Sequence, residues 1–149
     1  MAPTSAEIET ADRLSRRRAR MLPALAAIFV IQQAAYFAEP DVATRLVDEV
    51  KIGAWLLLSI VLLLALATGG FWLKPKRVRA LMDDDATRSN RASALGLGFI
   101  VTMTGAILLY ALNLIEPMSG REAIHLLTTI GLVTALLRFF YLERRDLRE

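Results

Sequence analysis

Residues 92–115 have the sequence ASALGLGFIVTMTGAILLYALNLI, and no side chain in this stretch carries a charge. A helix rises 1.5 Å per residue, so about 20 apolar residues cross the roughly 30 Å hydrocarbon core of a membrane. Backbone groups inside lipid must find their hydrogen-bond partners within the same segment, which favours a helix. This stretch therefore predicts a transmembrane helix.

Three further stretches of the 149-residue chain have the same character: 21–38, 52–73 and 123–142. The four stretches together contain one charged residue, Arg138. The chain is 55% hydrophobic, and this excess over an ordinary soluble domain is gathered in these blocks. The composition excludes a soluble globular domain, and we expect one all-α domain over residues 1–149, an integral membrane four-helix bundle.

Basic residues are distributed unevenly among the connections. Fifteen Lys and Arg residues lie in the arm 1–20, in the loop 74–91 and from residue 138 onward, whereas only three lie in the other two connections. Membrane proteins keep positive charge on the cytoplasmic side. We therefore expect a multi-pass protein of the cytoplasmic (inner) membrane whose N- and C-termini, basic arm and loop 74–91 are all cytoplasmic.

The same arginine clusters bear on binding partners. Basic residues beside a membrane predict anionic lipid headgroups as partners. No basic helix is interleaved with base-stacking aromatic residues, so we expect no direct binding of nucleic acid.

Two connections carry weaker helical signals. Ile8, Ala11 and Leu14 have helical spacing, so residues 1–20 form either a short amphipathic helix on the inner surface or a disordered arm. In the connection 39–51, Val42 and Val50 lie on one helical face with Leu46, which favours an interfacial helix over a plain loop.

The first and third predicted spans both end in Glu-Pro, at Glu39 and Glu116, and a glycine follows in each next span. One interpretation is a duplicated hairpin that brings both carboxylates to a pseudo-two-fold axis at the outer face. The other is a pair of solvated carboxylates at turns, because Pro commonly follows a helix end. Together with His125, these two residues make up a candidate polar site at the outer face.

Three aspartates, Asp83, Asp84 and Asp85, stand in the middle loop. Carboxylates cap exposed amides and favour the positive end of the helix dipole, so we expect a helix that begins near Asp84 and runs about two turns before entering lipid. Arg88 lies four residues after Asp84 and is placed to pair with it. Successive helical residues point about 100° apart and no His is near, so this run predicts no metal site.

Residues 81–88, LMDDDATR, with Arg91, Ala94, Gly98 and Phe99, resemble a loop of certain uncharacterised four-span prokaryotic membrane proteins. Those proteins carry an Asp-Glu-Arg-like motif at the start of their third helix, and some are encoded beside small helix-turn-helix regulators. Asp85 stands where that family prefers Glu. The resemblance implies an interaction at the cytoplasmic face rather than a chemistry, through the partner-binding residues Asp83, Asp84, Asp85, Arg88 and Arg91.

Ionisable residues within a membrane are costly and usually functional, and this chain has almost none there. The first three predicted spans contain no Asp, Glu, Lys, Arg or His, which excludes proton-coupled transport through a central carboxylate and intramembrane aspartyl proteolysis. The absence of cysteine excludes thiol chemistry, and a single His excludes haem held by paired imidazoles. We predict a protein that is not an enzyme and uses no cofactor or metal.

Small and polar residues in the spans predict helix packing. The third span places five of them on one side together with one leucine. Only one of Gln32 and Gln33 can face the same interior, because they are adjacent. This stripe packs either within one bundle or against a second copy or partner subunit. The candidate helix-packing residues are Gln32, Gln33, Gly98, Thr102, Gly105 and Asn113, with Ala94 and Leu109 completing the stripe.

His125 is expected in the first turn of the fourth span, near the outer face. A functional interpretation is a pH sensor or a ligand shared across subunits. The alternative is a histidine that is hydrogen-bonded at the interface.

The leading functional hypothesis is a non-enzymatic membrane protein that binds or sequesters a cytoplasmic protein, such as a small transcriptional regulator, through loop 74–91. The second is a small homo-oligomeric channel or carrier for a neutral or lipophilic solute. Its path would be lined by Gln32, Gln33, Thr102, Asn113 and His125. A third is an accessory subunit of a membrane complex.

Overall fold

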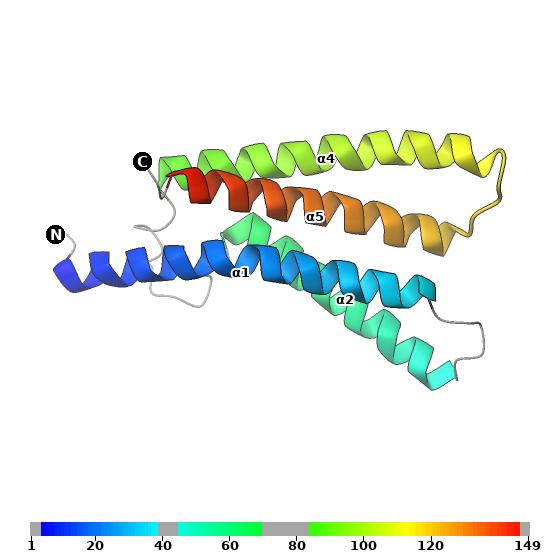
Figure 1. Ribbon diagram of the computed structural model, residues 1–149, viewed down its shortest axis with the longest axis horizontal. Helices are drawn as coiled ribbons and strands as arrows, with labels where there is room; N and C mark the ends of the chain where they lie inside the picture. The colour runs from blue at the N-terminus through cyan, green and yellow to red at the C-terminus, as the bar shows by residue number, and fades with distance from the viewer. Residues whose placement is uncertain (1–3, 39–44, 70–83, 147–149) are drawn as a thin grey trace.

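The computed structural model describes residues 4–38, 45–69 and 84–146. They form four helices: α1 (Ser5–Ala38), α2 (Arg45–Thr68), α4 (Asp85–Asn113) and α5 (Gly120–Asp146), shown in Figure 1. The described residues are thus all-helical, as predicted. Each helix is also long and apolar enough to cross a membrane. Residues 39–44 and 70–83, which include Glu39, Asp83 and most of loop 74–91, lie outside the described residues.

Helix α1 differs from the expected arm followed by a separate span. From Ser5 to Ala38 the chain is one helix, which continues through Pro23. Residues 5–22 are rich in Ala, Arg, Glu and Leu, which are strong helix formers, so the arm is neither a short separate helix nor disordered. Pro23 removes one backbone hydrogen bond without ending the helix.

Part of the predicted interfacial helix belongs to α2. Residues 45–51 are helical, but they form the first two turns of α2 itself. At its other end, Gly69 follows the last helical residue with φ 76°. Glycine adopts this left-handed conformation easily and commonly terminates helices.

The ends of the α4–α5 hairpin are capped by side chains. Asp84 caps α4, as expected, because its Oδ1 accepts a hydrogen bond of 2.8 Å from the Thr87 amide. Ser119 and Glu122 bond reciprocally before α5: the Ser119 amide donates to Glu122 Oε2 (2.9 Å) and the Glu122 amide donates to Ser119 Oγ (3.2 Å). Hydrogen bonds from Ser119 hold the pKa of Glu122, which lies before the apolar segment 123–142, below its ordinary value.

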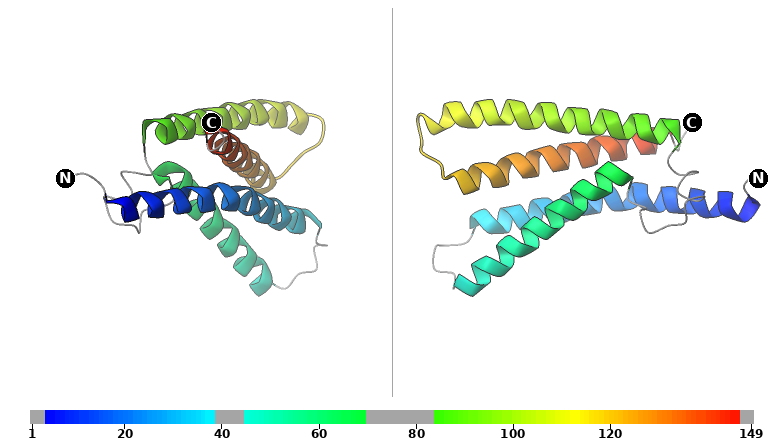
Figure 2. Two further views of the ribbon diagram at one scale, coloured as in Figure 1. Left: turned by 60° about the vertical axis from the view of Figure 1, so that its left-hand side comes forward. Right: turned by 180° about the vertical axis from the view of Figure 1, so that it is seen from behind.

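Helix α5 is the centre of the bundle. Helix α4 runs antiparallel along one side of it, α1 packs on another side, and α2 contacts α5 and, less extensively, α4 (Figures 1 and 2). Towards its N-terminal end α2 diverges from the other helices (Figure 2). One apolar core nevertheless includes residues of all four helices: Leu22, Ala26, Phe29, Trp55, Leu62, Leu66, Ala94, Leu132, Ala135, Leu136 and Phe139.

Three residues of the predicted small-residue stripe, Gly98, Thr102 and Gly105, lie at the α4–α5 contact. A Cβ added to Gly98 would lie 2.9 Å from the carbonyl oxygen of Gly131, and one added to Gly131 would overlap Thr102 Oγ1. A Cβ on Gly105 would lie 3.3 Å from Leu127 Cδ2. Within this chain the stripe therefore serves close packing between two of its own helices.

Candidate functional site

Arg18 of α1 joins all four helices at one end of the bundle. Its guanidinium forms a buried ion pair with Glu143 of α5. It also donates hydrogen bonds to Thr87 Oγ1 of α4 (3.5 Å) and to the carbonyl oxygen of Gly69 after α2 (3.4 Å). We call Arg18, Gly69, Thr87 and Glu143 the arginine cluster.

The sequence predicts contacts with lipid headgroups for the basic residues of arm 1–20, but Arg18 is buried inside the bundle. Arg18 precedes Leu22, Ala26 and Phe29 by 4, 8 and 11 residues, so it continues the buried face of α1. Glu143 follows Phe139 and Leu136 in the same way on α5. Because Arg18 and Glu143 each continue the helical spacing of the buried apolar residues, this periodicity could have identified both as buried.

The first turns of α4 are fixed by polar contacts on one face. Thr87 accepts from Arg18, and Asn90 Nδ2 donates to Asp146 Oδ2 of α5 at 2.7 Å. Thr87, Asn90 and Ala94 are all buried on this face. The start of α4 is therefore attached to both α1 and α5.

The predicted partner-binding residues lie mainly on the opposite face. Asp84, Asp85 and Arg88 are exposed, and Arg91 is half-buried. Arg88 Nη1 lies 3.5 Å from Asp85 Oδ1, whereas Asp84 serves as the helix cap. The structure thus brings these four residues together at the start of α4, where Asp84, Asp85 and Arg88 are exposed.

A second polar cluster lies among α1, α2 and α5. The side-chain oxygen of Gln33 accepts two hydrogen bonds, from His125 Nδ1 (3.3 Å) and from Thr129 Oγ1 (3.0 Å). The His125 ring is stacked between two aromatic rings, with centroid distances of 4.2 Å to Tyr36 and 3.9 Å to Trp55. Gln33 is therefore the glutamine that faces the interior.

Three buried donors of α1 and α2 have no protein partner among the described residues: Gln33 Nε2, Trp55 Nε1 and, one helical turn after Trp55, Ser59 Oγ. Each belongs to a side chain that is at least nine-tenths buried. A buried donor without a hydrogen bond costs about 1–3 kcal/mol. We call the residues that contact one another around His125 the histidine cluster: Gln33, Tyr36, Trp55, His125 and Thr129.

Other predicted site residues lie elsewhere. Glu116 is exposed in the connection between α4 and α5. Asn113 is also exposed, and its side-chain oxygen accepts a hydrogen bond from the Met118 amide at 2.7 Å. Thr102 donates back to the carbonyl oxygen of Gly98 in its own helix. Thr102 and Asn113 therefore form these hydrogen bonds outside the cluster around His125.

Cavities border both clusters. One of about 190 Å³ is lined by Gln32, Tyr36, Trp55, His125 and the first turns of α2. Another, of about 290 Å³, lies between α1 and α2 beside Arg17 and Arg18.

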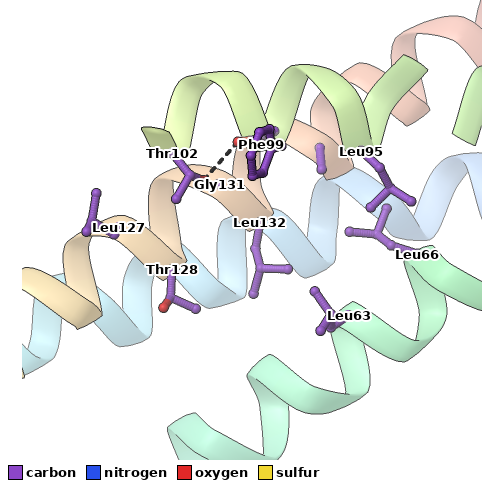
Figure 3. A pocket seen from close by; sticks show the side chains of 11 residues that line it. Leu63, Leu66, Leu95, Phe99, Thr102, Leu127, Thr128, Gly131 and Leu132 are labelled. Carbon is purple, nitrogen blue, oxygen red and sulfur yellow. Dashed lines mark hydrogen bonds between the residues drawn. The ribbon is translucent and has the colours of Figure 1, made fainter. Parts of the chain in front are cut away.

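The cavity in Figure 3, of about 320 Å³, lies among α2, α4 and α5 and has an almost wholly apolar wall. Leu63, Leu66, Phe99 and Leu132 surround it, and the Thr102 hydroxyl is bonded within α4. Its wall has few groups that could form hydrogen bonds with a ligand.

In the part of the chain that the structure describes, no three His, Cys, Asp or Glu side chains are grouped so that they could hold a metal ion. Comparison with known protein families, curated proteins and solved structures gives no match to this chain. The resemblance of residues 81–99 to four-span prokaryotic proteins therefore stays a prediction.

Proposed function

We propose that this chain is a non-enzymatic protein of the cytoplasmic membrane that spans the bilayer four times and binds a cytoplasmic protein through the start of α4 and loop 74–91. Four apolar helices support the membrane location. Many large apolar side chains of these helices are exposed, among them Ile31, Leu57, Phe99 and Ile107. Lipid is the solvent that suits such a surface.

The orientation in this proposal rests on the basic residues. Arg13, Arg16, Arg17 and Arg20 are exposed on the first turns of α1, where anionic lipid headgroups are their natural partners. The start of α4 and the end of α5 lie at the same end of the bundle, as the Asn90–Asp146 hydrogen bond shows. With both termini cytoplasmic, this end faces the cytoplasm.

One observation carries the partner-binding role: the start of α4 is fixed on one face and charged on the other. Thr87 and Asn90 attach it to α1 and α5, while Asp85 and Arg88 are exposed. A surface that is already ordered loses little conformational entropy when a partner binds. The charge pattern supplies specificity more than affinity.

Crosslinking and affinity capture from native membranes test this role. Asp84→Asn with Asp85→Asn removes two negative charges but keeps a capping side chain at position 84, so partner capture is expected to fall while membrane insertion is unchanged. Glu116→Gln, at the opposite end, is the matched control. Equal capture by both proteins would contradict the proposal, and a soluble DNA-binding protein among the captured species would identify the partner as a regulator.

A second candidate is a small homo-oligomeric carrier for a neutral solute. The buried Gln33–His125–Thr129 hydrogen bonds favour it, because polar groups in an apolar bundle are costly and usually functional. Flux of a neutral solute through reconstituted liposomes should then fall in Gln33→Leu. An accessory role in a larger membrane complex would instead appear as co-purifying membrane subunits.

A further inference from the structure

The cavity beside the arginine cluster combines an apolar wall with an exposed arginine. It has a volume of about 290 Å³ and lies between α1 and α2, and α5 contributes Phe139 to its wall. The apolar residues that α1 and α2 contribute are Leu14, Met21, Leu22, Leu25, Ala65 and Leu66. Arg17 lines the same cavity although its side chain is exposed. A charged hydrogen-bond donor is therefore open to a molecule that enters the cavity.

The two arginines of the cavity wall have different roles. Arg18 is buried and bonds to Glu143, Thr87 and the Gly69 carbonyl oxygen, so its charge is compensated inside the bundle. Among the described residues that line the cavity, none is acidic. The charge that Arg17 brings to the cavity is therefore one that an anion can neutralise, and a guanidinium suits a phosphate because it can donate two parallel hydrogen bonds.

The cavity extends from the level of the headgroups into the apolar part of the bundle. Arg17 precedes the apolar segment 21–38 by four residues, and Leu25 lies about 12 Å further along α1. With the N-terminus in the cytoplasm, the cavity covers much of the inner half of a hydrocarbon core that is roughly 30 Å thick. Met21 is 47% exposed, so the cavity is open to the surroundings at this edge.

The basic residues of α1 are arranged around the edge of this cavity. Arg13 and Arg20 lie four residues before and three residues after Arg17, which places them on neighbouring turns of one stripe, and both are exposed. Arg16 lies nine residues before Leu25 and therefore on the opposite side of the helix. An apolar cavity with positive charge at its outer edge is complementary to an anionic lipid, whose charge and chains are arranged in the same order.

We propose that this cavity binds one anionic diacyl phospholipid of the inner leaflet. One acyl chain occupies the apolar space between α1 and α2, and Arg17 donates hydrogen bonds to the headgroup phosphate. A cavity of about 150 Å³ is large enough for benzene, so this one holds several methylene groups of a chain. The inference rests on the proposed membrane location, and it is separate from the cytoplasmic partner at the start of α4.

Native mass spectrometry of the delipidated full-length protein tests the proposal. The probes are dioleoyl phosphatidylglycerol, which carries a net negative charge, and dioleoyl phosphatidylcholine, which has the same chains but no net charge. The first phosphatidylglycerol should bind more tightly than the first phosphatidylcholine. Inorganic phosphate at the same concentration should not displace it, because a free phosphate leaves the apolar wall unoccupied.

Two variants with the same loss of charge locate the site. Arg17→Gln should weaken binding of the first phosphatidylglycerol about tenfold, the effect of losing a hydrogen bond to a charged group. Arg16→Gln, on the opposite side of α1, is the matched control and should have a much smaller effect. Met21→Trp fills the open edge of the cavity and should weaken the binding of both lipids. Its result counts if its circular dichroism and thermal unfolding match the parent, and the two arginine variants decide the matter if they do not.

Three outcomes would overturn the inference. Equal weakening by Arg16→Gln and Arg17→Gln would mean that the lipid is held by the overall charge of the arm. Equal affinity for the two lipids would remove the role of the headgroup charge, and displacement by inorganic phosphate would mean that the acyl chain does not contribute. None of these results bears on the proposed topology, which is tested separately by labelling of a cysteine at Ser5 in intact cells.

Discussion

The guanidinium of Arg18 and the carboxylate of Glu143 form an ion pair whose two side chains are 7% and 6% exposed, although 125 residues separate them in sequence. Arg18 also lies 5.3 Å from the ring centroid of Phe139, so its charge is covered by an aromatic face. A pair enclosed in this way fixes how α1 meets α5. It also leaves a costly charge behind when one partner is removed.

Removal of one member of this pair should therefore destabilise the protein strongly. Glu143→Ala or Arg18→Ala is expected to lower the free energy of unfolding by about 3–5 kcal/mol, because the remaining charge stays buried without its partner. Arg18→Met with Glu143→Leu should cost much less than the two single alanine variants combined. Unfolding of the parent, Arg18→Met, Glu143→Leu and the double variant in detergent micelles completes a double-mutant cycle, which measures the coupling.

Arg17→Ala is the matched control, because Arg17 is the exposed neighbour of Arg18. Its effect should stay within about 0.5 kcal/mol. Strictly additive effects of the Arg18 and Glu143 substitutions would show that the pair does not act as a unit.

Alanine substitution should destabilise the protein at the glycines of the α4–α5 contact but not at glycines that face open space. Gly131→Ala places a methyl group against Thr102 Oγ1 and should destabilise the protein by about 1–3 kcal/mol. Thr102→Ala in the same chain removes that overlap and should restore much of the loss. Thermal unfolding of the single and double variants checks both statements.

Gly96→Ala is the control, because nothing lies within 4 Å of a Cβ at Gly96. Here the better helix propensity of alanine should leave stability unchanged or raise it by up to about 1 kcal/mol. If Gly96→Ala were as harmful as Gly131→Ala, close packing would not explain the difference between the two positions.

Two substitutions at Asp84 should separate the stabilising effect of the helix cap from that of the negative charge. Asp84→Ala is expected to cost about 0.5–2 kcal/mol, whereas Asp84→Asn keeps an acceptor for the Thr87 amide and should cost less. Hydrogen exchange of the amides in the first turn of α4 measures this locally. Equal protection in the two variants would indicate that the side chain at position 84 does not hold the helix start.

Membrane orientation is accessible because the chain contains no cysteine. Single cysteines in place of Ser5 and Ser89 should react with an impermeant maleimide only after cells are permeabilised, whereas a cysteine in place of Glu116 should react in intact cells. All three positions are exposed. Ser5 and Ser89 lie near the starts of α1 and α4 at one end of the bundle, and Glu116 lies in the α4–α5 connection at the other end. Labelling of Ser5→Cys in intact cells would place the N-terminus outside and overturn the proposed topology.

Local features of the fold were predictable from sequence, and long-range pairs were not. The apolar blocks indicated four helices, and the aspartates predicted the start of α4, because both depend on neighbouring residues. The Gly98–Thr102–Gly105 stripe showed which face of α4 is small, since helical periodicity gives the face. Periodicity did not show that α5 would be its partner.

The histidine cluster shows why contacts between distant residues could not be predicted from sequence. Sequence restricted the inward-facing residue to Gln32 or Gln33 without choosing between them. The choice depends on His125 and Thr129, more than ninety residues away, whose hydrogen bonds to the Gln33 oxygen require α1 and α5 to be adjacent. The sequence also predicts a break between the charged arm and the first span, whereas α1 is continuous because residues 5–22 have high helix propensity.

The central position of α5 has a consequence for biogenesis. It is the last of the four helices along the chain, yet α1, α2 and α4 all pack against it. A nascent protein that has released only α1 and α2 from the ribosome has not yet made the surface on which they assemble, so those two helices remain loosely associated. Under the proposed four-span topology, a product terminated before residue 120 should therefore insert without completing its fold.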